Sequence, residues 1–287
     1  MIQSPLRSET VTSADGTTIG FRTVGSGPGL IVVGGALSTA ETYGRLGDCL
    51  KSRFAVHLMD RRGRDLSGPQ GHDYSVDREC EGVLAIAAAT GSTMAFGHSF
   101  GGLVVLESAL RSDRLQRIAV YDPAVSVGGS IPTEWIPRYR ELLSAGDSRG
   151  AFALFVQKLG PTPIRRMPQW YLRFVLRAAI RSDRWRRMEP LLAANANEHD
   201  ALRRQTGPVR RYAPIRIPVL LLAGAKSPHS GKGAVDALHG EIATSELAVL
   251  KGLDHSAPEE RPDTVAGDLS TFFSDAYQEE VAKPTLR

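Results

Sequence analysis

The stretch Gly97-His98-Ser99-Phe100-Gly101 decides the fold of this chain. Residues 93–96 before it form an apolar run typical of a buried strand, and residues 103–110 after it show an apolar helical pattern. A serine in such a strand-turn-helix connection occupies a cramped backbone position, so the residues two places away must be very small, as Gly97 and Gly101 are. The sequence therefore predicts that Ser99 is held out as a nucleophile at the carboxyl end of a strand, with the amino terminus of a helix beneath it.

Strands and helices are expected to alternate on both sides of this turn. Two strands at 9–12 and 17–24 should form an antiparallel ribbon, because Ala14-Asp15-Gly16 between them is a hairpin signal. The β-branched run at 30–33 is typical of a strand that helices cover on both faces. Such alternation predicts an α/β fold with a mostly parallel sheet flanked by helices. Further strands are expected at 55–59, 117–121, 217–223 and 247–250, with helices at 41–50, 76–89 and 263–274 and no regular structure after Tyr277.

The pattern changes between residues 124 and 214. Aromatic side chains recur here in helical stretches that prolines at 161, 163 and 168 interrupt. This pattern predicts a helical cap (lid) inserted into the sheet domain, so that residues 1–123 and 215–287 form the core and 124–214 form the cap. Trp135, near the start of the cap, is a candidate for contact with substrate.

Composition favours one α/β domain with an insertion. The chain has 287 residues, of which 42% are hydrophobic, which is enough for a large core. Its two cysteines, Cys49 and Cys80, cannot form a disulfide framework and lack metal-type spacing, which favours a reducing compartment. The start has no charged region followed by an apolar run, and no stretch approaches the roughly eighteen apolar residues of a membrane span. We therefore expect a cytoplasmic protein without membrane association.

Charge is distributed unevenly along the chain. Residues 131–216 hold sixteen arginines and Lys158 against seven acidic residues, a net charge of +10, so the remainder of the chain carries −6. Such a segment can attract an anionic substrate or an acyl group on an acidic carrier protein, or it can be a solvated helical face. No aromatic-interleaved basic motif or zinc-finger spacing is present, so we expect no nucleic-acid partner.

Groups from distant parts of the sequence can form one site, because the carboxyl ends of parallel strands share an edge of the sheet. An alcohol is a poor nucleophile at neutral pH, so Ser99 needs a base, and His255 in the loop after the last strand is the candidate. The backbone N–H groups of Ala36 and Phe100 are suitably placed to stabilise an oxyanion. His98 either packs into the turn or contacts substrate. The candidate substrate-binding residues are His98, Gly35 and Trp135.

Taken together, these motifs resemble those of the α/β-hydrolase superfamily, and within it the capped esterases and lipase-like hydrolases. The resemblance covers about residues 8 to 275 and implies a mostly parallel eight-stranded sheet with a helical cap. At Gly34 the sequence departs from the common pattern, since many members have histidine there. The resemblance rests on residues 97–102, Asp60-Arg61-Arg62-Gly63-Arg64, Gly34-Gly35 and Asp254-His255-Ser256-Ala257-Pro258.

The sequence departs from the family pattern again at the acid that orients the histidine. In most members this acid follows the seventh strand, where the present chain has Ser227, and a serine cannot supply a counter-charge to imidazolium. Some members place the acid after the sixth strand, where this chain offers Asp122. We therefore assign the orienting role to Asp122 and keep Asp236 in reserve. Asp254 adjoins His255 but should point elsewhere, because adjacent side chains in an extended loop diverge.

The leading functional hypothesis is a cofactor-independent serine hydrolase that cleaves a small carboxylic ester, lactone or thioester through an acyl-enzyme. One alternative is a biosynthetic cyclase, carbon-carbon hydrolase or isomerase on the same fold, which Ser227 in place of an acid motivates. Another is a non-catalytic ligand receptor whose cap reports occupancy. Neither a metal nor a nucleotide cofactor is expected, because the histidines lack paired spacing and residues 25–29 lack the third glycine of a dinucleotide loop. The oligomeric state is left open.

Overall fold

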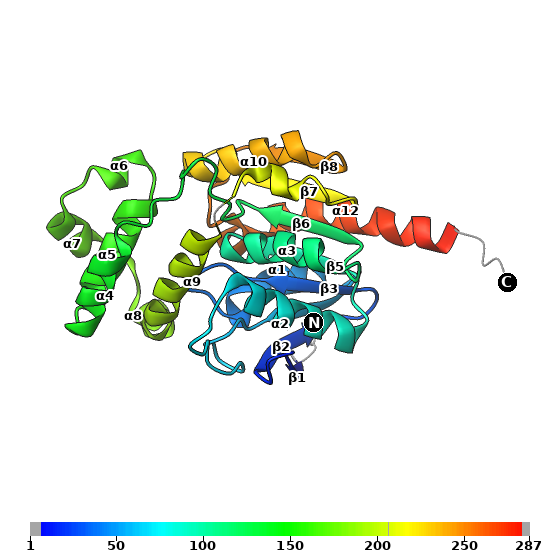
Figure 1. The fold of residues 1–287 in the computed structure, drawn as a ribbon, viewed down its shortest axis with the longest axis horizontal. Coiled ribbons are helices and arrows are strands. Elements are labelled where there is room, and N and C mark those ends of the chain that lie inside the picture. Colours follow the sequence, from blue (N-terminus) through cyan, green and yellow to red (C-terminus); the bar gives the residue numbers. More distant parts are fainter. Residues whose placement is uncertain (1–6, 206, 283–287) are drawn as a thin grey trace.

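The strands form one twisted sheet at the centre of the molecule (Figure 1). A computed structural model describes residues 7–205 and 207–282. Eight strands lie in the order β1-β2-β4-β3-β5-β6-β7-β8, and only the β1–β2 and β2–β4 pairs are antiparallel. The mostly parallel eight-stranded sheet expected from the sequence is therefore confirmed. Its strands are β1 (Arg7–Thr12), β2 (Thr18–Val24), β3 (Gly29–Val33), β4 (Ala55–Met59), β5 (Met94–His98), β6 (Arg117–Tyr121), β7 (Val219–Gly224) and β8 (Ser245–Leu250).

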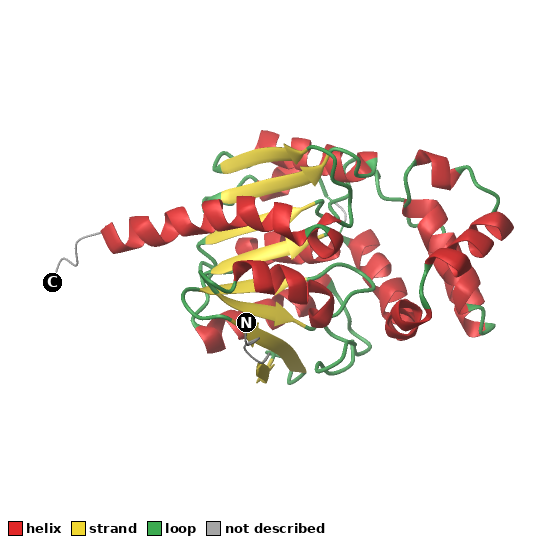
Figure 2. Cartoon of the chain, turned by 180° about the vertical axis from the view of Figure 1, so that it is seen from behind, coloured by secondary structure: helices red, strands yellow, loops and turns green. Residues whose placement is uncertain are grey.

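Helices cover both faces of this sheet (Figure 2). On one face α2 (Val76–Thr90), α3 (Phe100–Arg111) and α10 (His229–Glu241) share a hydrophobic core with the strands. On the other face, α1 (Gly44–Leu50) and α12 (Pro262–Ala282) do the same. Every residue of β5 and β6 is buried, as expected for central strands between two helical layers.

The end of the chain differs from expectation. We predicted no regular structure after Tyr277, but α12 continues to Ala282, so that prediction is wrong for these residues. Residues 283–287 lie outside the described part of the chain. Between β8 and α12 runs the short helix α11 (Ala257–Glu260), which follows the loop that carries His255.

Six α-helices are inserted between β6 and β7, and we call them the inserted helices. Several of them form a small core of their own around Trp135, Tyr139, Phe152 and Trp185. In Figure 1 the first five extend away from the sheet, whereas the last, α9, lies against the sheet domain. The domain boundaries at 123/124 and 214/215 stay a prediction. The inserted helices are α4 (Ile136–Ser144), α5 (Ser148–Leu159), α6 (Thr162–Arg165), α7 (Gln169–Ala179), α8 (Ser182–Met188) and α9 (Leu192–Arg204).

A buried ion cluster joins α9 to the sheet domain. Arg61, just after β4, places Nη1 3.1 Å from Glu79 Oε1 on α2 and Nη2 3.1 Å from Glu198 Oε2 on α9. Arg64 binds the other oxygen of Glu198. Burial raises the pKa of a carboxyl group, but the two guanidinium groups outweigh it and lower the pKa of Glu198. Glu198 is therefore ionised and ties an inserted helix to the core.

We expect Glu198→Gln to lower the free energy of unfolding by about 3–5 kcal/mol, because removing one partner leaves buried charge uncompensated. The matched control is Asp200→Asn on the same helix. Asp200 pairs with Arg140 near the surface, so its loss should change the free energy by at most about 1 kcal/mol. Urea unfolding of the wild type and both variants measures the difference, and equal effects of the two substitutions would contradict the assignment.

Candidate active site

Ser99 sits in a sharp turn between β5 and α3. Its backbone adopts φ 55° and ψ −119°, a left-handed φ that a non-glycine residue rarely takes. The N–H group of Ser99 donates to the carbonyl of Tyr121 at 3.0 Å, which ties the turn to β6. The turn also needs glycine at 101, because a Cβ there would lie 2.1 Å from the carbonyl oxygen of Val33. These constraints hold the serine out from the end of the sheet.

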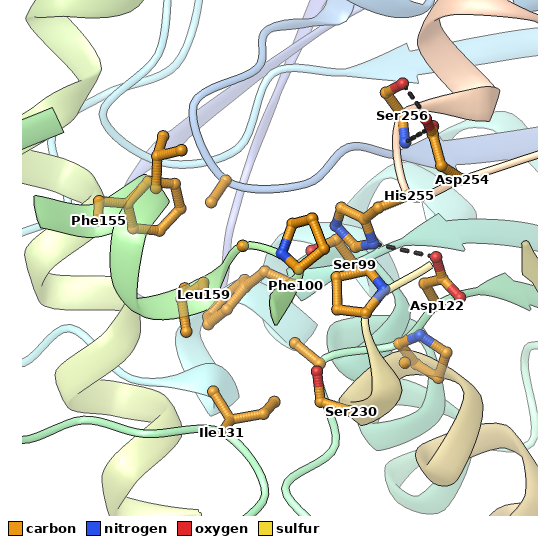
Figure 3. A pocket seen from close by; sticks show the side chains of 18 of the residues that line it. Ser99, Phe100, Asp122, Ile131, Phe155, Leu159, Ser230, Asp254, His255 and Ser256 are labelled. Atoms are coloured by element: carbon orange, nitrogen blue, oxygen red, sulfur yellow. Dashed lines mark hydrogen bonds and ion pairs between the residues drawn. The ribbon is translucent and has the colours of Figure 1, made fainter. Parts of the chain in front are cut away.

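His255 and Asp122 contact each other directly at the same end of the sheet. Nδ1 of His255 lies 3.1 Å from Oδ2 of Asp122, whose side chain is fully buried after β6 (Figure 3). Burial favours the neutral imidazole, but the hydrogen bond and charge of Asp122 outweigh it and raise the pKa of His255. The pair is thus arranged to stabilise an imidazolium ion.

Ser227, which follows β7, forms a hydrogen bond with Asp122. Its hydroxyl donates to the same Oδ2 atom that faces His255. The start of α10 approaches the other oxygen closely, since a Cβ on Gly231 would lie 2.9 Å from Asp122 Oδ1. The carboxylate is therefore held between two elements of the core.

The other two acidic candidates lie apart from this contact. Asp236 forms an exposed pair with Lys232 at 2.7 Å. Asp254 accepts hydrogen bonds from the N–H and hydroxyl groups of Ser256 at 3.0 and 2.8 Å, as Figure 3 shows. The structure therefore brings Asp122, and neither of these two residues, into contact with His255 Nδ1.

His98 is buried beneath the site and bridges two of its loops. Its Nε2 lies 2.8 Å from the carbonyl oxygen of His255, and its Nδ1 lies 2.7 Å from the hydroxyl of Tyr43. That hydroxyl accepts the N–H of Gly35 at 2.9 Å. Burial and the neighbouring His255 lower the pKa of His98 well below its usual range, so the ring is neutral. A proton on Nε2 alone satisfies both contacts of His98, which thus supports the loops.

Tyr43 explains the glycine at position 34. A Cβ on Gly34 would lie 2.5 Å from the Tyr43 ring and 2.8 Å from Ser38 Oγ. The tyrosine ring therefore fills the space that a side chain at 34 would need. Sequence reasoning missed Tyr43, because nothing in the local pattern shows that its hydroxyl reaches the loop after β3.

Arg61 fixes the loop that carries Ala36. Its Nε and Nη2 atoms each donate to a backbone carbonyl, of Gly34 and Gly35 respectively, at 2.9 Å. The guanidinium carbon also lies 4.8 Å from the centre of the Phe100 ring. Arg61 thus orients both segments that bear the candidate oxyanion donors. The run of charges directly after a buried strand was the available sequence signal for this residue.

A cavity of about 550 Å³ opens above these groups, and Ser99, His255, Ala36 and Phe100 all line it. In Figure 3, Ser99 and His255 are on the sheet side, whereas Phe155 belongs to an inserted helix on the opposite side. The walls are mainly apolar. The inserted segment contributes Ile131, Phe155, Val156, Leu159, Ile164 and Leu202 to them.

Three expected binding residues do not line this cavity. Gly35 and His98 lie beneath it, as described above. Trp135 is 3% exposed and packs in the core of the inserted helices against Phe155 and His199, which themselves line the cavity. The expectation of direct contact is thus not met for Trp135, because its bulky ring is used to pack the inserted helices together.

The charged lining differs from what the sequence suggested. None of the sixteen arginines between 131 and 216 is among the residues that line the cavity, where Lys226 is the cationic side chain. Within residues 7–205 and 207–282, no cluster of three or more His, Cys, Asp or Glu side chains could hold a metal ion. No helix in this described part is long and apolar enough to cross a membrane.

Comparison with known proteins agrees with this architecture. A model of the alpha/beta hydrolase family matches residues 30–269. An alpha/beta hydrolase from Sphaerobacter thermophilus is 32% identical, with a TM-score of 0.79 over 92% of this chain and 100% of the other. The fold is also that of an enol-lactonase from Burkholderia xenovorans, at 21% identity and a TM-score of 0.72 over 93% of this chain and 100% of that one.

A second relative, whose name gives its reaction, matches a shorter part of the chain. The N-formylmaleamate deformylase of Pseudomonas putida is 38% identical over 110 residues, which make up 37% of this chain and 41% of the deformylase. The aligned region thus spans less than half of that relative's length. From the extent of the family match and the full-length structural relative, the chain belongs to the alpha/beta hydrolase family and is an enzyme of the hydrolase type.

Proposed function

We propose that this protein is a cofactor-independent serine hydrolase that cleaves a carboxylic ester, lactone or thioester through an acyl-enzyme. The observation that carries the proposal is the backbone of Ser99, which is held at a left-handed φ on the wall of a cavity that it shares with His255. The contact between His255 and Asp122 supports the same reading, since it orients the base.

In the proposed reaction, Ser99 Oγ attacks the substrate carbonyl while Nε2 of His255 takes its proton. Asp122 stabilises the resulting imidazolium, and the N–H groups of Ala36 and Phe100 stabilise the oxyanion. His255 then gives its proton to the leaving oxygen or sulfur, which departs and leaves an ester on Ser99. Water, deprotonated by His255, attacks this ester, and His255 returns the proton to Ser99 Oγ as the acid leaves, which restores the serine and the neutral imidazole.

The cavity walls favour a substrate with an apolar acyl portion. Burial of apolar surface is worth roughly 25 cal/mol per Å², so contact with the aliphatic and aromatic wall stabilises such a group. Because no arginine lines the cavity, the basic charge of residues 131–216 does not explain how an anionic substrate would be bound in the site. A carboxylate on the substrate would instead meet Lys226.

A second candidate reaction is the hydrolysis of a formyl amide that bears a carboxylate. The deformylase relative motivates it, and Lys226 in the cavity lining favours it. The cyclase, carbon-carbon hydrolase and isomerase alternatives were motivated by Ser227 in place of an acid. That motive is weakened, because Asp122 supplies the carboxylate and Ser227 binds it.

We expect a fluorophosphonate probe to label the wild type at one site, because an activated serine attacks phosphorus as it attacks a carbonyl carbon. Ser99→Ala should abolish the labelling, and His255→Ala should slow it by roughly 10³-fold or more. The matched control is Ser230→Ala, since Ser230 lines the same cavity and has no hydrogen bond to a histidine or carboxylate among the side chains that the structure describes. Intact-mass spectrometry reads the result, and labelling that survives Ser99→Ala would refute the assignment.

The rate should fall at low pH as His255 becomes protonated, because only the neutral imidazole accepts a proton. Asp122 raises the pKa of His255, so Asp122→Asn should move the acid limb of kcat/KM to lower pH. The same substitution should reduce the maximal rate by roughly 10³–10⁴-fold. In the control Asp254→Asn, the maximal rate should be nearly retained, as Asp254 binds Ser256. Equal losses in both variants would argue against Asp122 as the orienting acid.

Lys226→Met separates the two candidate reactions. If the substrate carries a carboxylate that Lys226 binds, KM for N-formylmaleamate should rise roughly tenfold to a hundredfold. For a neutral ester with an apolar acyl chain, the same substitution should leave KM nearly unchanged. Steady-state kinetics of the wild type and the variant on both substrates distinguish the two reactions. If the wild type hydrolyses the ester but not N-formylmaleamate, the deformylase reaction is eliminated.

A further inference from the structure

The outer surface of α7 is unusual for a folded protein. Four large hydrophobic side chains are exposed among those the structure describes, and three of them, Trp170, Tyr171 and Phe174, lie on this helix. Trp170 is 72% exposed and Phe174 69%. These two residues are four positions apart, so they project from the same face of the helix. Both views place α7 among the inserted helices at the end of the molecule farthest from the sheet (Figures 1 and 2).

The same region is strongly basic. Residues 165–187 hold eight arginines and one aspartate, a net charge of +7. Within the described part of the chain, no ion pair is found for Arg165, Arg166 or Arg177. We call these three arginines, with Trp170, Tyr171 and Phe174, the α7 surface. It combines exposed aromatic rings with uncompensated positive charge.

A second cavity opens beside the α7 surface, at the start of α5. It measures about 370 Å³, and Arg149, Arg173 and Arg177 line it together with Phe174. Nη1 of Arg149 is buried there and has no hydrogen-bond partner among the described residues. The guanidinium carbon of Arg149 lies 3.6 Å from the centre of the Trp185 ring, so this ring holds the positive charge at the wall of the cavity.

The acidic groups in this cavity are already engaged. Asp147 binds Arg173 through two hydrogen bonds of 2.8 and 2.9 Å and accepts the N–H of Gly150 at 2.9 Å. Glu189 accepts the indole N–H of Trp185 at 2.9 Å. Two of the three lining guanidinium groups, those of Arg149 and Arg177, have no carboxylate partner in the described residues. Guanidinium groups without a carboxylate partner are well suited to bind the oxygens of a phosphate group.

We propose that the α7 surface docks on an anionic phospholipid membrane, with a lipid phosphate in the cavity of Arg149, Arg173 and Arg177 and the rings of Trp170 and Phe174 in the interface. Aromatic side chains favour the region between headgroups and acyl chains, and basic residues around them are attracted to anionic lipid. The proposal is independent of the proposed reaction, because binding requires no catalysis. It replaces the expectation of no membrane association, which rested on the lack of a spanning apolar run, because docking at the interface needs no spanning segment.

Charge also argues against a second copy of this chain as the occupant. A two-fold dimer through the α7 surface would place the same patch on both partners and bring arginine against arginine. An anionic bilayer instead supplies negative charge and an apolar layer together, which matches both features of the surface. On α5, Arg149 lies six residues before Phe155, the first residue of this helix in the active-site wall, so the arginine cavity is about 9 Å along the helix from that wall.

The test is binding of the full chain to vesicles of phosphatidylcholine with and without phosphatidylserine, measured by co-sedimentation at low and near-physiological salt. The wild type should bind the phosphatidylserine vesicles, with weaker binding at higher salt. Tryptophan emission should shift to the blue on binding, and Trp170 is the reporter, since Trp135 and Trp185 are already buried. Trp170→Phe should keep the sedimentation and lose the shift.

Matched variants separate the two components of the surface. A triple variant tests the charges, with glutamine in place of Arg165, Arg166 and Arg177. Its binding to the vesicles should be weaker on the order of a hundredfold, at about fivefold per charge. The same three-charge change at Arg114, Arg203 and Arg210, which are exposed elsewhere, should have a far smaller effect. The double variant Trp170→Ser and Phe174→Ser should lose binding, whereas Val249→Ser at the remaining exposed hydrophobic residue should keep it.

Four results would overturn the proposal. The first is that the protein does not bind phosphatidylserine vesicles, and the second is that it binds neutral vesicles equally well. The third is that inorganic phosphate saturates the protein in calorimetry although the protein does not bind vesicles. The fourth is a dimer in size-exclusion chromatography that Trp170→Ser dissociates. Binding to polyglutamate but not to vesicles counts as the first result and indicates an acidic protein partner. Ser99→Ala should bind vesicles as the wild type does, so a failure of the proposed reaction and a failure of this proposal are distinguishable.

Discussion

The buried contact of Arg61 with Glu198 is the interaction on which the rest of the site depends. One guanidinium group holds the carbonyls of Gly34 and Gly35, lies against Phe100, and meets a carboxylate from the inserted α9. Its charge can stay buried only because Glu79 and Glu198 compensate it. The loop with the candidate oxyanion donor, the turn after Ser99 and the inserted helix α9 are therefore joined through one side chain.

A second network supports the candidate base from below. The N–H of Gly35 reaches the hydroxyl of Tyr43, which contacts His98, and His98 in turn contacts the carbonyl of His255. This chain of hydrogen bonds connects the loop after β3 with the loop after β8. Because burial holds His98 neutral, both of its ring nitrogens keep fixed roles as donor and acceptor. Two loops that must face one substrate are thereby positioned relative to each other.

The inserted helices combine two different surfaces on one short element. The carboxyl-terminal half of α5 faces the cavity over Ser99 with Phe155, Val156 and Leu159, whereas its amino-terminal end contributes Arg149 to the arginine cavity. The basic charge seen in the sequence thus lies outside the active-site cavity. An apolar wall suits an acyl group, and exposed arginines with aromatic rings suit an anionic interface, so the two surfaces fit partners of different chemistry.

Local patterns in the sequence determined the alternating α/β architecture, the turn at Ser99 and the candidates His255 and Asp122. Each of these features depends on a few neighbouring residues. Apolar runs mark the strands, small glycines mark the turn, and short motifs carry the family resemblance. Only the tertiary structure decided that Trp135 and His98 are buried away from the cavity, that Tyr43 fills the space beside Gly34, and that no arginine of the basic segment lines the cavity. These outcomes depend on side-chain direction and on contacts such as Arg61 with Glu198, which are 137 residues apart in the chain. A sequence pattern shows the spacing of apolar residues and so the type of each element. The packing of the elements against each other decides which of their side chains come into contact.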